Sequence, residues 1–434
     1  MRLKQLRFGA FKSLYDVTCD FEDLTAVTGP NGAGKSNLAD GIAFIGDAYS
    51  YSLELAVARA GGYDSIAHRR TRRARTPVSF EIHVTVPTRE LGSLGRLITP
   101  VIPDIRRHDR SLFFKHRFSI RAEGQALTSV FRVEEDDMVV SGAGQDILRM
   151  SRTNGGRAKT WTNDLFSDMG EAPPNRNPLY PFTSRSYLEL IAEQAASSPS
   201  DLLINIIPSA GLLNRIVRSL ADLRIFQLAP NQCRLSGVPT PNASLNRHGE
   251  NLPAVADFLQ KHVASAWTRI EGAMRAIIPR LEVIEVIHTE DRRLALQFRE
   301  AGVRRPWNAN EVSDGTIQAL ALFTAIFDER TPLLVVEEPE NSLHPWILRH
   351  FVDLCRESGK QVILTTHSPV LINYLPPGSL RFMWQSDGKS RWASLYDLDP
   401  SLVDLWKNGE VQAFEGYDQG LFPEVVPQHF SSRD

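Results

Sequence analysis

Apolar and polar residues alternate over several short stretches of the N-terminal third, a pattern that predicts β-strands with one buried face. Charged and apolar residues interleave over residues 1–8, and two shorter strand candidates follow at 17–21 and 24–28. The alternation returns further along, most clearly at 79–86 and 114–120. The segments between about 78 and 140 predict an antiparallel β subdomain.

The middle of the chain loses this alternation. Residues 141–183 are rich in Gly, Asn, Asp and Pro and have little periodicity, which predicts a long loop or a variable insertion. Apolar residues then recur at helical spacing near 186–196, 209–222 and 252–277. No heptad repeat is sustained, so we expect a mainly helical central insertion over 141–280 without a long coiled-coil arm.

The last third alternates between helical and strand patterns. It predicts a helix near 315–328, a buried strand at 333–336, a helix near 346–357 and a strand at 362–365. Such alternation is typical of parallel strands in one sheet. Residues 380–434 add two short strands and a small helix. The chain is therefore expected to be α/β, with an N-terminal lobe at 1–140, the insertion at 141–280 and a C-terminal lobe at 281–434.

The composition limits which binding partners and which cellular compartment we expect for this protein. Lys plus Arg number 49 against 51 Asp plus Glu, a net charge of −2, which excludes a uniformly basic nucleic-acid binder. The three cysteines are far apart and form no CxxC pair, which argues against a disulfide framework or a structural zinc site. The chain starts without an apolar leader pattern, and no stretch approaches roughly 18 apolar residues. We expect a cytoplasmic protein with no membrane partner.

A glycine-rich turn lies between the strand at 24–28 and a helical pattern. Residues 29–36 read GPNGAGKS and match GxxxxGK[ST], in which backbone N–H groups surround phosphates. Lys35 would reach the β- and γ-phosphates of ATP, and Ser36 would bind Mg²⁺ at a helix N-terminus. The alternative is a turn without a ligand, but the flanking strand and helix favour the nucleotide. The predicted ATP-binding residues here are Gly29, Asn31, Gly32, Gly34, Lys35, Ser36 and Asn37.

An acidic pair follows the buried strand at 333–336. A buried parallel strand delivers the residues after it to the carboxyl edge of the sheet. Glu337 would hold Mg²⁺, directly or through water, and Glu338 would orient or deprotonate the attacking water. The alternative is a solvated acidic loop that ends a core strand.

Two further groups are candidates for phosphate contacts. Ser313, Asp314 and Gly315 precede an apolar helix, so a hydroxyl and backbone amides stand at a helix N-terminus. His367 follows a predicted strand, where an imidazole can donate to a γ-phosphate. Taken singly, such a turn is more often only an N-cap, and a lone histidine at a strand end is more often structural.

The order of these motifs resembles the ATP-binding-cassette ATPases of the RecF, SMC and OLD type, over about 1–90 and 280–380. The resemblance implies an ABC-type P-loop fold in which the SDGT signature binds, in trans, the ATP of a second subunit. It implies that the segment beginning Asn341-Ser342 is the D-loop, that His367 is the switch histidine, and that residues 8–14, including Lys12, wall the nucleotide pocket. The segment 245–253, LNRHGENLP, also resembles the OLD-like branch.

The sequence departs from this family at three points. The magnesium acid is Glu337 where many relatives have Asp, and Gln125 and Gln145 are only weak candidates for a Q-loop glutamine. The nuclease domain of OLD proteins is expected to be absent. We therefore expect a homodimer or higher homo-oligomer that works with a separate effector, either a nuclease or a toxin.

Two clusters of basic residues could contact the phosphates of double-stranded DNA. A looser cluster around 106–117 includes Lys115 and Arg117; the denser cluster consists of Arg69, Arg70, Arg72, Arg73 and Arg75. The alternative is solvated loops, or pairing with the acids at 134–137.

Three functional hypotheses follow. The first is an ATPase whose ATP-dependent head-to-tail dimerisation gates DNA handling or an effector, in anti-phage defence or DNA repair. The second is a scaffold or sensor with low turnover that sequesters a separate toxin or nuclease. The third, the ATPase subunit of a transporter, is disfavoured by the missing Q-loop, the SDGT form and the large insertion.

Overall fold

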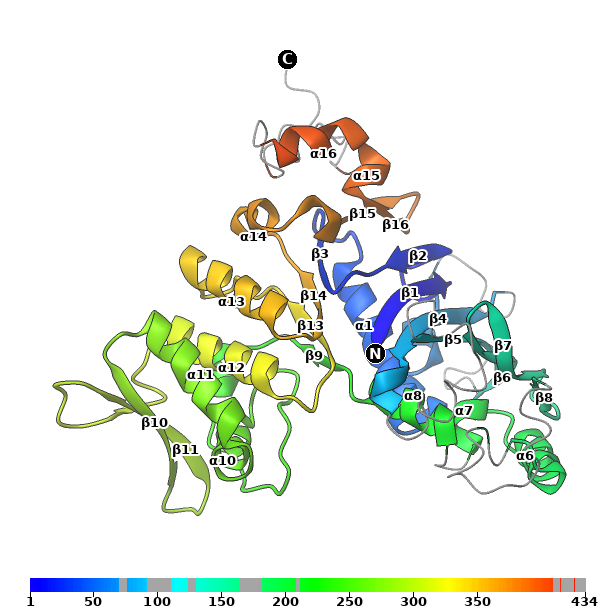
Figure 1. The fold of residues 1–434 in the computed structure, drawn as a ribbon, viewed down its shortest axis with the longest axis horizontal. Coiled ribbons are helices and arrows are strands. Elements are labelled where there is room, and N and C mark those ends of the chain that lie inside the picture. The colour runs from blue at the N-terminus through cyan, green and yellow to red at the C-terminus, as the bar shows by residue number, and fades with distance from the viewer. Residues whose placement is uncertain are drawn as a thin grey trace. The chain divides into compact units, whose positions relative to one another are not determined.

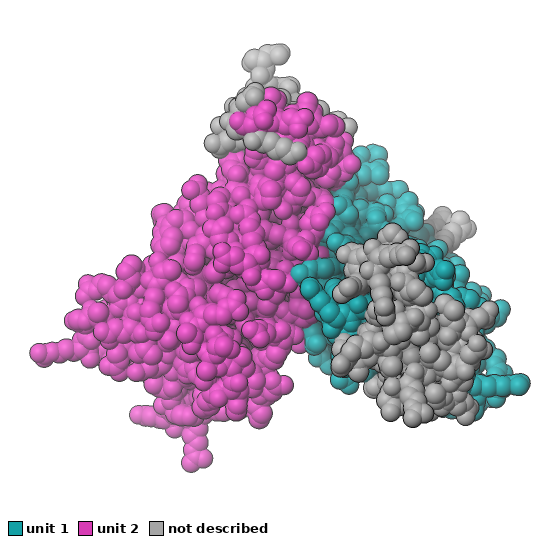
Figure 2. All heavy atoms as spheres, in the orientation of Figure 1, with its two compact units in different colours: residues 1–21, 32–222, 384–392 teal, residues 22–31, 223–383, 393–434 magenta. Residues whose placement is uncertain are grey.

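The computed structural model describes residues 1–69, 76–91, 111–123, 130–163, 179, 182–207, 211–408, 414 and 425. The chain divides into two compact units (Figure 2). Unit 1 comprises Met1–Phe21, Gly32–Asp222 and Trp384–Trp392, and unit 2 comprises Glu22–Asn31, Leu223–Met383 and Ala393–Asp434. Each unit is thus built from separate stretches of sequence. The division into lobes at 1–140, 141–280 and 281–434 stays a prediction.

Unit 1 contains a seven-stranded antiparallel sheet with the order β2-β1-β4-β5-β6-β7-β8 (Figure 1). The strands are β1 (Arg2–Gly9), β2 (Val17–Asp20), β4 (Val78–Pro87), β5 (Ser111–Glu123), β6 (Val130–Gly142), β7 (Gln145–Thr153) and β8 (Lys159–Thr162). The antiparallel β subdomain is confirmed. The loop predicted over 141–183 is wrong for 145–162, where β7 and β8 extend the sheet. Ala143 and Gly144, with φ of 50° and 79°, make a two-residue hairpin turn that pairs β7 with β6.

The helices of unit 1 include α1 (Lys35–Ser50), which follows the glycine-rich turn. Phe44 of α1 stacks on Phe80 of β4 with 5.1 Å between ring centroids, and Phe80 stacks on Phe118 of β5 at 5.0 Å. These aromatic contacts fix α1 on the sheet. The remaining helices are α2 (Leu53–Arg59), α3 (Tyr63–Ile66), the 3₁₀ helix η1 (Thr88–Leu91), α6 (Arg185–Ser197), α7 (Leu203–Ile206) and α8 (Gly211–Ala221).

Unit 2 is built on parallel strands in the order β15-β3-β14-β13-β9, with β16 next to β15. They are β3 (Leu24–Thr28), β9 (Arg224–Phe226), β13 (Leu333–Glu337), β14 (Gln361–Thr365), β15 (Leu380–Ser386) and β16 (Lys389–Ser394). The end of β15 and most of β16 lie in Trp384–Trp392, which is counted with unit 1. Every residue of β3, β13 and β14 is buried. The predicted parallel sheet is confirmed. The three-residue strand β9 has no sequence signal of its own and depends on pairing with β13.

The helices of unit 2 are α9 (Pro230–Cys233), α10 (Leu252–His262), α11 (Ala264–Ile277), α12 (Asp314–Phe327), α13 (Pro345–Glu357), α14 (Pro369–Tyr374), η3 (Pro377–Ser379), α15 (Leu395–Leu398) and α16 (Pro400–Lys407). Helices α13 and α14 lie beside β13 and β14, whereas α10 and α11 lie beside β10 (Leu281–His288) and β11 (Leu294–Glu300), as Figure 1 shows. The single helix predicted at 252–277 is wrong, because Val263 leaves the helical region (φ −137°, ψ 58°) and separates α10 from α11. The three-stranded sheet of β10, β11 and β12 (Trp307–Asn308) was not predicted. No helix in the described ranges is long and apolar enough to cross a membrane.

Candidate nucleotide-binding site

The carboxyl ends of three parallel strands meet at one edge of the sheet in unit 2. Strand register sets Glu337 of β13 opposite Thr365 of β14, and Thr365 opposite Val27 of β3. The backbone N–H of Glu338 donates to the Thr365 carbonyl at 2.9 Å, and that of Thr366 donates to Val27 at 3.0 Å. The residues that follow these strands, among them the predicted site residues Gly29, Glu338 and His367, are therefore brought to the same edge.

The predicted P-loop begins at this edge and continues into unit 1. Gly29, Pro30 and Asn31 follow β3 and belong to unit 2, whereas Gly32 to Ser36 belong to unit 1. Gly34 has φ +113° and immediately precedes α1, whose first residue is Lys35. The predicted strand, loop and helix are therefore all present, and Ser36 and Asn37 occupy the first turn of α1.

Two serines support the unit 1 half of this loop. Ser390 Oγ donates to the Ala33 carbonyl at 2.8 Å and lies 2.8 Å from Ser13 Oγ. Asn37 Nδ2 donates to Ser13 Oγ at 2.7 Å. Ser13 stands in the segment that the family resemblance places at the nucleotide. Ser390 has no comparable signal, because it is 377 positions away from Ser13 in the chain.

Lys12, a predicted ATP-binding residue, is paired within unit 1. Its Nζ lies 2.6 Å from Asp40 Oδ2, and its backbone N–H donates to Ile66 at 2.7 Å. Lys12 has φ +48°. The structure thus places Lys12 beside α1, with its ammonium group on a carboxylate.

Glu337 is the most buried acid at the sheet edge, with a side chain only 4% exposed. Its Oε1 accepts a hydrogen bond from Arg247 Nη2 at 2.7 Å. Burial makes an ionised carboxylate costly unless a cation or several donors compensate it, and Arg247 supplies that cation. The sequence singled out the segment around Arg247 but gave this arginine no role.

Glu338 is half-buried and has a strained backbone, with φ +46°. Its Oε2 accepts from Asn341 Nδ2 at 3.1 Å, and its carbonyl accepts from the Asn341 N–H at 3.2 Å. The predicted D-loop residue therefore holds the predicted catalytic carboxylate within one chain.

Glu340 is a functional candidate that sequence reasoning missed. Its Oε1 accepts from Thr366 Oγ1 at 2.8 Å and from the His367 N–H at 2.7 Å. This carboxylate ties the loop after β13 to the loop after β14 and so positions His367, whose side chain is exposed. The available signal was the third acid in the sequence Glu337-Glu338-Pro339-Glu340.

The predicted signature residues lie at the N-terminus of α12. Ser313 caps the helix by accepting from the Thr316 N–H at 3.2 Å, as the N-cap interpretation predicts. Asp314 Oδ1 lies 2.5 Å from Arg234 Nη1, and the same guanidinium donates to the Val312 carbonyl at 2.8 Å. Gly315 allows close packing, because a Cβ there would lie 2.9 Å from the Ser342 carbonyl. The signature and the D-loop are therefore neighbours in one chain.

The donor chemistry at the sheet edge fits Mg²⁺ better than a transition metal. Glu337, the predicted metal ligand at this edge, offers carboxylate oxygens, which Mg²⁺ prefers, and substrate phosphates and water commonly complete its shell. In the part of the chain that the structure describes, no group of three or more His, Cys, Asp or Glu side chains forms a ready-made metal cage.

The basic clusters are only partly described. Arg69 is exposed, whereas Arg70, Arg72, Arg73 and Arg75 lie outside the described residues. In the looser cluster, Lys115 pairs with Glu81 at 2.7 Å and Arg117 pairs with Glu135 at 3.2 Å. Burial raises the pKa of Glu81, but hydrogen bonds from Lys115 and His83 outweigh it and hold that pKa below its ordinary value. The described part of this cluster follows the ion-pair alternative.

The weak Q-loop candidates gain no support. Gln145 is an exposed residue at the start of β7, and Gln125 lies outside the described residues.

Comparison with known proteins gives one family match. The family model described as "AAA domain, putative AbiEii toxin, Type IV TA system" matches residues 24–124 and 174–373, more than half of the chain. The search of curated proteins gives no match.

Solved structures with similarity to this chain include three SMC heads. One, bound to the C-winged helix domain of ScpA, is 15% identical with a TM-score of 0.49, and the alignment covers 92% of this chain and 99% of that chain. The Thermotoga maritima SMC head is 15% identical with a TM-score of 0.41, covering 91% and 99%. The Pyrococcus furiosus head with an extended coiled coil, bound to the C-terminal domain of ScpA, is 15% identical with a TM-score of 0.45, covering 93% and 99%.

Proposed function

Because this chain belongs to the AAA-domain family described as a putative AbiEii toxin of a type IV TA system, we propose that it binds and hydrolyses ATP. The observation that carries the proposal is the convergence of Gly29, Glu338 and His367 where β3, β13 and β14 end. A P-loop start, a paired acid and a histidine at one sheet edge are the parts that phosphoryl transfer to water requires.

In this proposal each group has one task. Lys35 and the backbone of the P-loop bind the phosphates, and Ser36 and Glu337 hold Mg²⁺, which neutralises charge on the phosphate oxygens when bound. Glu338 orients the attacking water and accepts its proton, with Asn341 fixing the carboxylate. His367 donates to the γ-phosphate, and Glu340 sets its backbone position.

We further propose that ATP joins two copies head to tail and that hydrolysis separates them. Support comes from the exposed N-terminus of α12, where Ser313 and Asp314 face solvent. A second subunit's γ-phosphate can be bound there by the serine hydroxyl and the helix N-terminus. This cycle would gate an associated effector or DNA handling, in anti-phage defence or DNA repair.

The deciding experiment measures steady-state ATP hydrolysis by the wild type and Lys35→Ala, with and without double-stranded DNA, over a salt series. We expect the wild type to hydrolyse ATP and Lys35→Ala to be inactive, because in this proposal the ammonium group of Lys35 binds the phosphates. Equal turnover in both proteins would overturn the proposal. Stimulation by DNA that weakens with salt would assign a DNA-handling role.

The family description supports a second candidate, a nucleotide-dependent component of a toxin–antitoxin or defence pair with low turnover. Here ATP binding holds or releases a toxin or nuclease and hydrolysis only resets the complex. Slow turnover indifferent to DNA, together with a protein that co-purifies with the wild type and is lost from Lys35→Ala, would favour this candidate.

A further inference from the structure

Arg247 lies in a segment whose backbone is hydrogen-bonded to the residues that follow β9, next to the end of β13. The last residue pair between β9 and β13 is Phe226 with Val336. The next residue after β9, Gln227, donates its N–H to the Arg247 carbonyl at 2.9 Å, and the Ala229 N–H donates to His248 at 3.3 Å. Arg247 is thus held level with Glu337, the residue after Val336.

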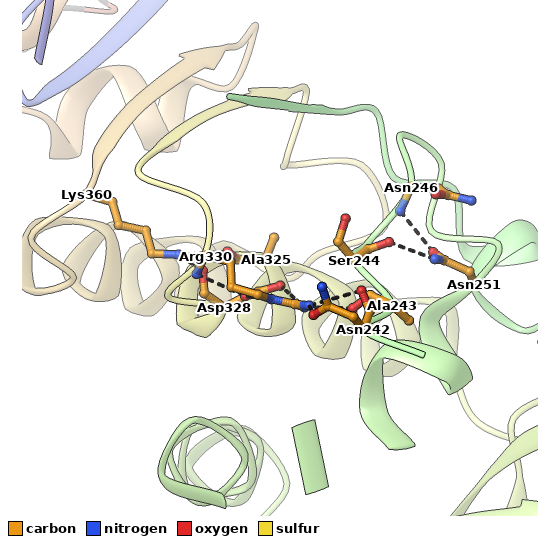
Figure 3. Close-up of polar contacts among 9 residues, drawn as sticks. All are labelled: Asn242, Ala243, Ser244, Asn246, Asn251, Ala325, Asp328, Arg330 and Lys360. Atoms are coloured by element: carbon orange, nitrogen blue, oxygen red, sulfur yellow. Dashed lines mark hydrogen bonds and ion pairs between the residues drawn. The ribbon is translucent and has the colours of Figure 1, made fainter. Parts of the chain in front are cut away.

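Side-chain amides lock the turn that carries Arg247 (Figure 3). The Asn246 N–H donates to Asn251 Oδ1 at 2.9 Å, and Asn251 Nδ2 donates to the Ser244 carbonyl at 2.8 Å. Gly249 has φ +82°, a conformation that other residues rarely adopt. Asn246, Gly249 and Asn251 thus set the conformation of the LNRHGENLP turn.

The start of the segment is held by a second clamp (Figure 3). Arg330 donates to Asn242 Oδ1 at 2.9 Å and to the Ala243 carbonyl at 2.7 Å, while its own charge is compensated by Asp328 Oδ2 at 2.6 Å. With both ends fixed, the guanidinium of Arg247 is presented to Glu337 by a preorganised turn rather than by a mobile loop.

We propose that Arg247 is a positioning residue that sets the divalent-cation affinity of Glu337 and makes cation binding depend on nucleotide. The proposal rests on the ATPase function proposed above. Arg247 already neutralises the buried carboxylate at 2.7 Å, so a dication arriving without ATP meets the fixed positive charge of the guanidinium. The negative charge of a triphosphate offsets that repulsion, and Arg247 keeps the carboxylate oriented for the metal.

The test titrates full-length protein with Mn²⁺, a magnetic probe for Mg²⁺, and follows free Mn²⁺ by electron paramagnetic resonance. Arg247→Gln keeps a hydrogen-bond donor and removes the charge, whereas Arg247→Lys keeps the charge. Without nucleotide, Arg247→Gln should bind Mn²⁺ about tenfold more tightly than the wild type, and Arg247→Lys should stay within about threefold of it. A non-hydrolysable ATP analogue should reduce the difference between Arg247→Gln and the wild type.

A background of Glu337→Gln provides the matched control, because without the carboxylate Arg247→Gln should no longer alter Mn²⁺ affinity. Three outcomes would each overturn the proposal. Arg247→Gln could still change Mn²⁺ affinity in the Glu337→Gln background, the wild type and Arg247→Gln could bind Mn²⁺ with equal affinity, or Arg247→Lys could bind Mn²⁺ as tightly as Arg247→Gln. Arg247→Met, which keeps the aliphatic stem, replaces Arg247→Gln if the latter does not fold. If both variants unfold where Arg247→Lys is folded, Arg247 serves stability and the metal role is overturned.

The same experiment separates this inference from the proposed function. A wild type that binds neither the ATP analogue nor Mn²⁺ in its presence would remove the ATPase function and this inference together. Analogue and Mn²⁺ binding that Arg247→Gln leaves unchanged would remove the role of Arg247 alone.

Discussion

Asp136 in the antiparallel sheet of unit 1 and Glu337 in the parallel sheet of unit 2 are both buried carboxylates beside an arginine. Asp136 lies inside β6, where the Leu203 N–H donates to it at 2.6 Å, His116 Nε2 lies at 3.0 Å and Arg152 Nε at 3.7 Å. Glu337 instead ends its strand. A carboxylate in mid-strand is enclosed by neighbouring strands, whereas one at the end of a parallel strand stands where ligands bind.

The polar groups around Asp136 form a network that connects several elements of unit 1. Tyr49 Oη lies 2.5 Å from the other ring nitrogen of His116, and burial raises the pKa of the Tyr49 hydroxyl. Arg152 also donates to the carbonyls of Ala195 and Ser198, at 3.0 and 3.1 Å. The network therefore joins α1, the sheet and the helices after it.

The largest expected effect is on Asp136. Asp136→Ala should lower the free energy of unfolding by about 4 kcal/mol, because it leaves Arg152 buried without its acid and the Leu203 N–H without its acceptor. Urea unfolding followed by circular dichroism measures the change. The matched control is Asp137→Ala, which breaks only the more exposed pair with Arg149 and should cost less than about 1 kcal/mol. Similar decreases in the free energy of unfolding of both variants would show that the buried Asp136 stabilises the fold no more than the exposed Asp137.

Glu338→Gln tests the proposed catalytic role of the carboxyl edge of the parallel sheet. We expect the kcat for ATP hydrolysis to fall by about 100-fold or more, since the variant cannot accept the proton of the attacking water. Binding of ATP should persist, and light scattering should show dimers accumulating with ATP. Lys35→Ala is the comparison variant that fails to bind. Normal turnover by Glu338→Gln would remove Glu338 from the role of base.

Lys360 in unit 2 and the buried Tyr49 in unit 1 should change stability in opposite directions as the pH rises. Lys360 Nζ donates to the Asp328 and Ala325 carbonyls, and burial lowers its pKa from 10.5 to about 8. Between these values the unfolded chain binds more protons than the folded one, so stability rises with pH through this window, by about 2 kcal/mol. Urea unfolding at pH 7.5 and pH 10 should show the free energy of unfolding of the wild type rising by this amount relative to that of Lys360→Met; the buried cysteines and Tyr49 are present in both proteins, so their own pH dependence cancels in the comparison. Parallel pH profiles would contradict the shift.

The smallest expected effect is at Asn341. Asn341→Ala should reduce kcat by about fivefold with little change in KM, because loss of one hydrogen bond of roughly 1 kcal/mol frees the Glu338 carboxylate to rotate. Steady-state kinetics with ATP measure it. Asn341→Asp, which places two acids together, should be slower still; activity equal to wild type in both variants would show that Asn341 does not position Glu338.

Much of the fold could be predicted because its signals are local. The short β-rich stretch Leu-Thr-Ala-Val-Thr at 24–28 and the four apolar residues followed by an acid at 333–337 each predict a buried strand from local sequence alone. The predictions of secondary structure were wrong where tertiary contacts, not local sequence, determine the conformation. β9 is too short to form without β13, α10 and α11 separate at one valine, and β7 depends on a hairpin turn at Ala143 and Gly144 rather than on its composition.

The sequence by itself determined the chemistry available to this protein: the GPNGAGKS loop, the acids at 337 and 338, the SDGT turn and His367, since each is a short pattern with a physical reason for its residue types. Only the tertiary structure decided which other residues contact and position these motif residues. Three such pairs join residues that are far apart in the chain: Arg247 with Glu337, Ser390 with Ala33, and Glu340 with His367. The physical reason is that spacing along the chain encodes which face of an element a residue occupies, whereas strand order and register decide which residues from distant segments meet.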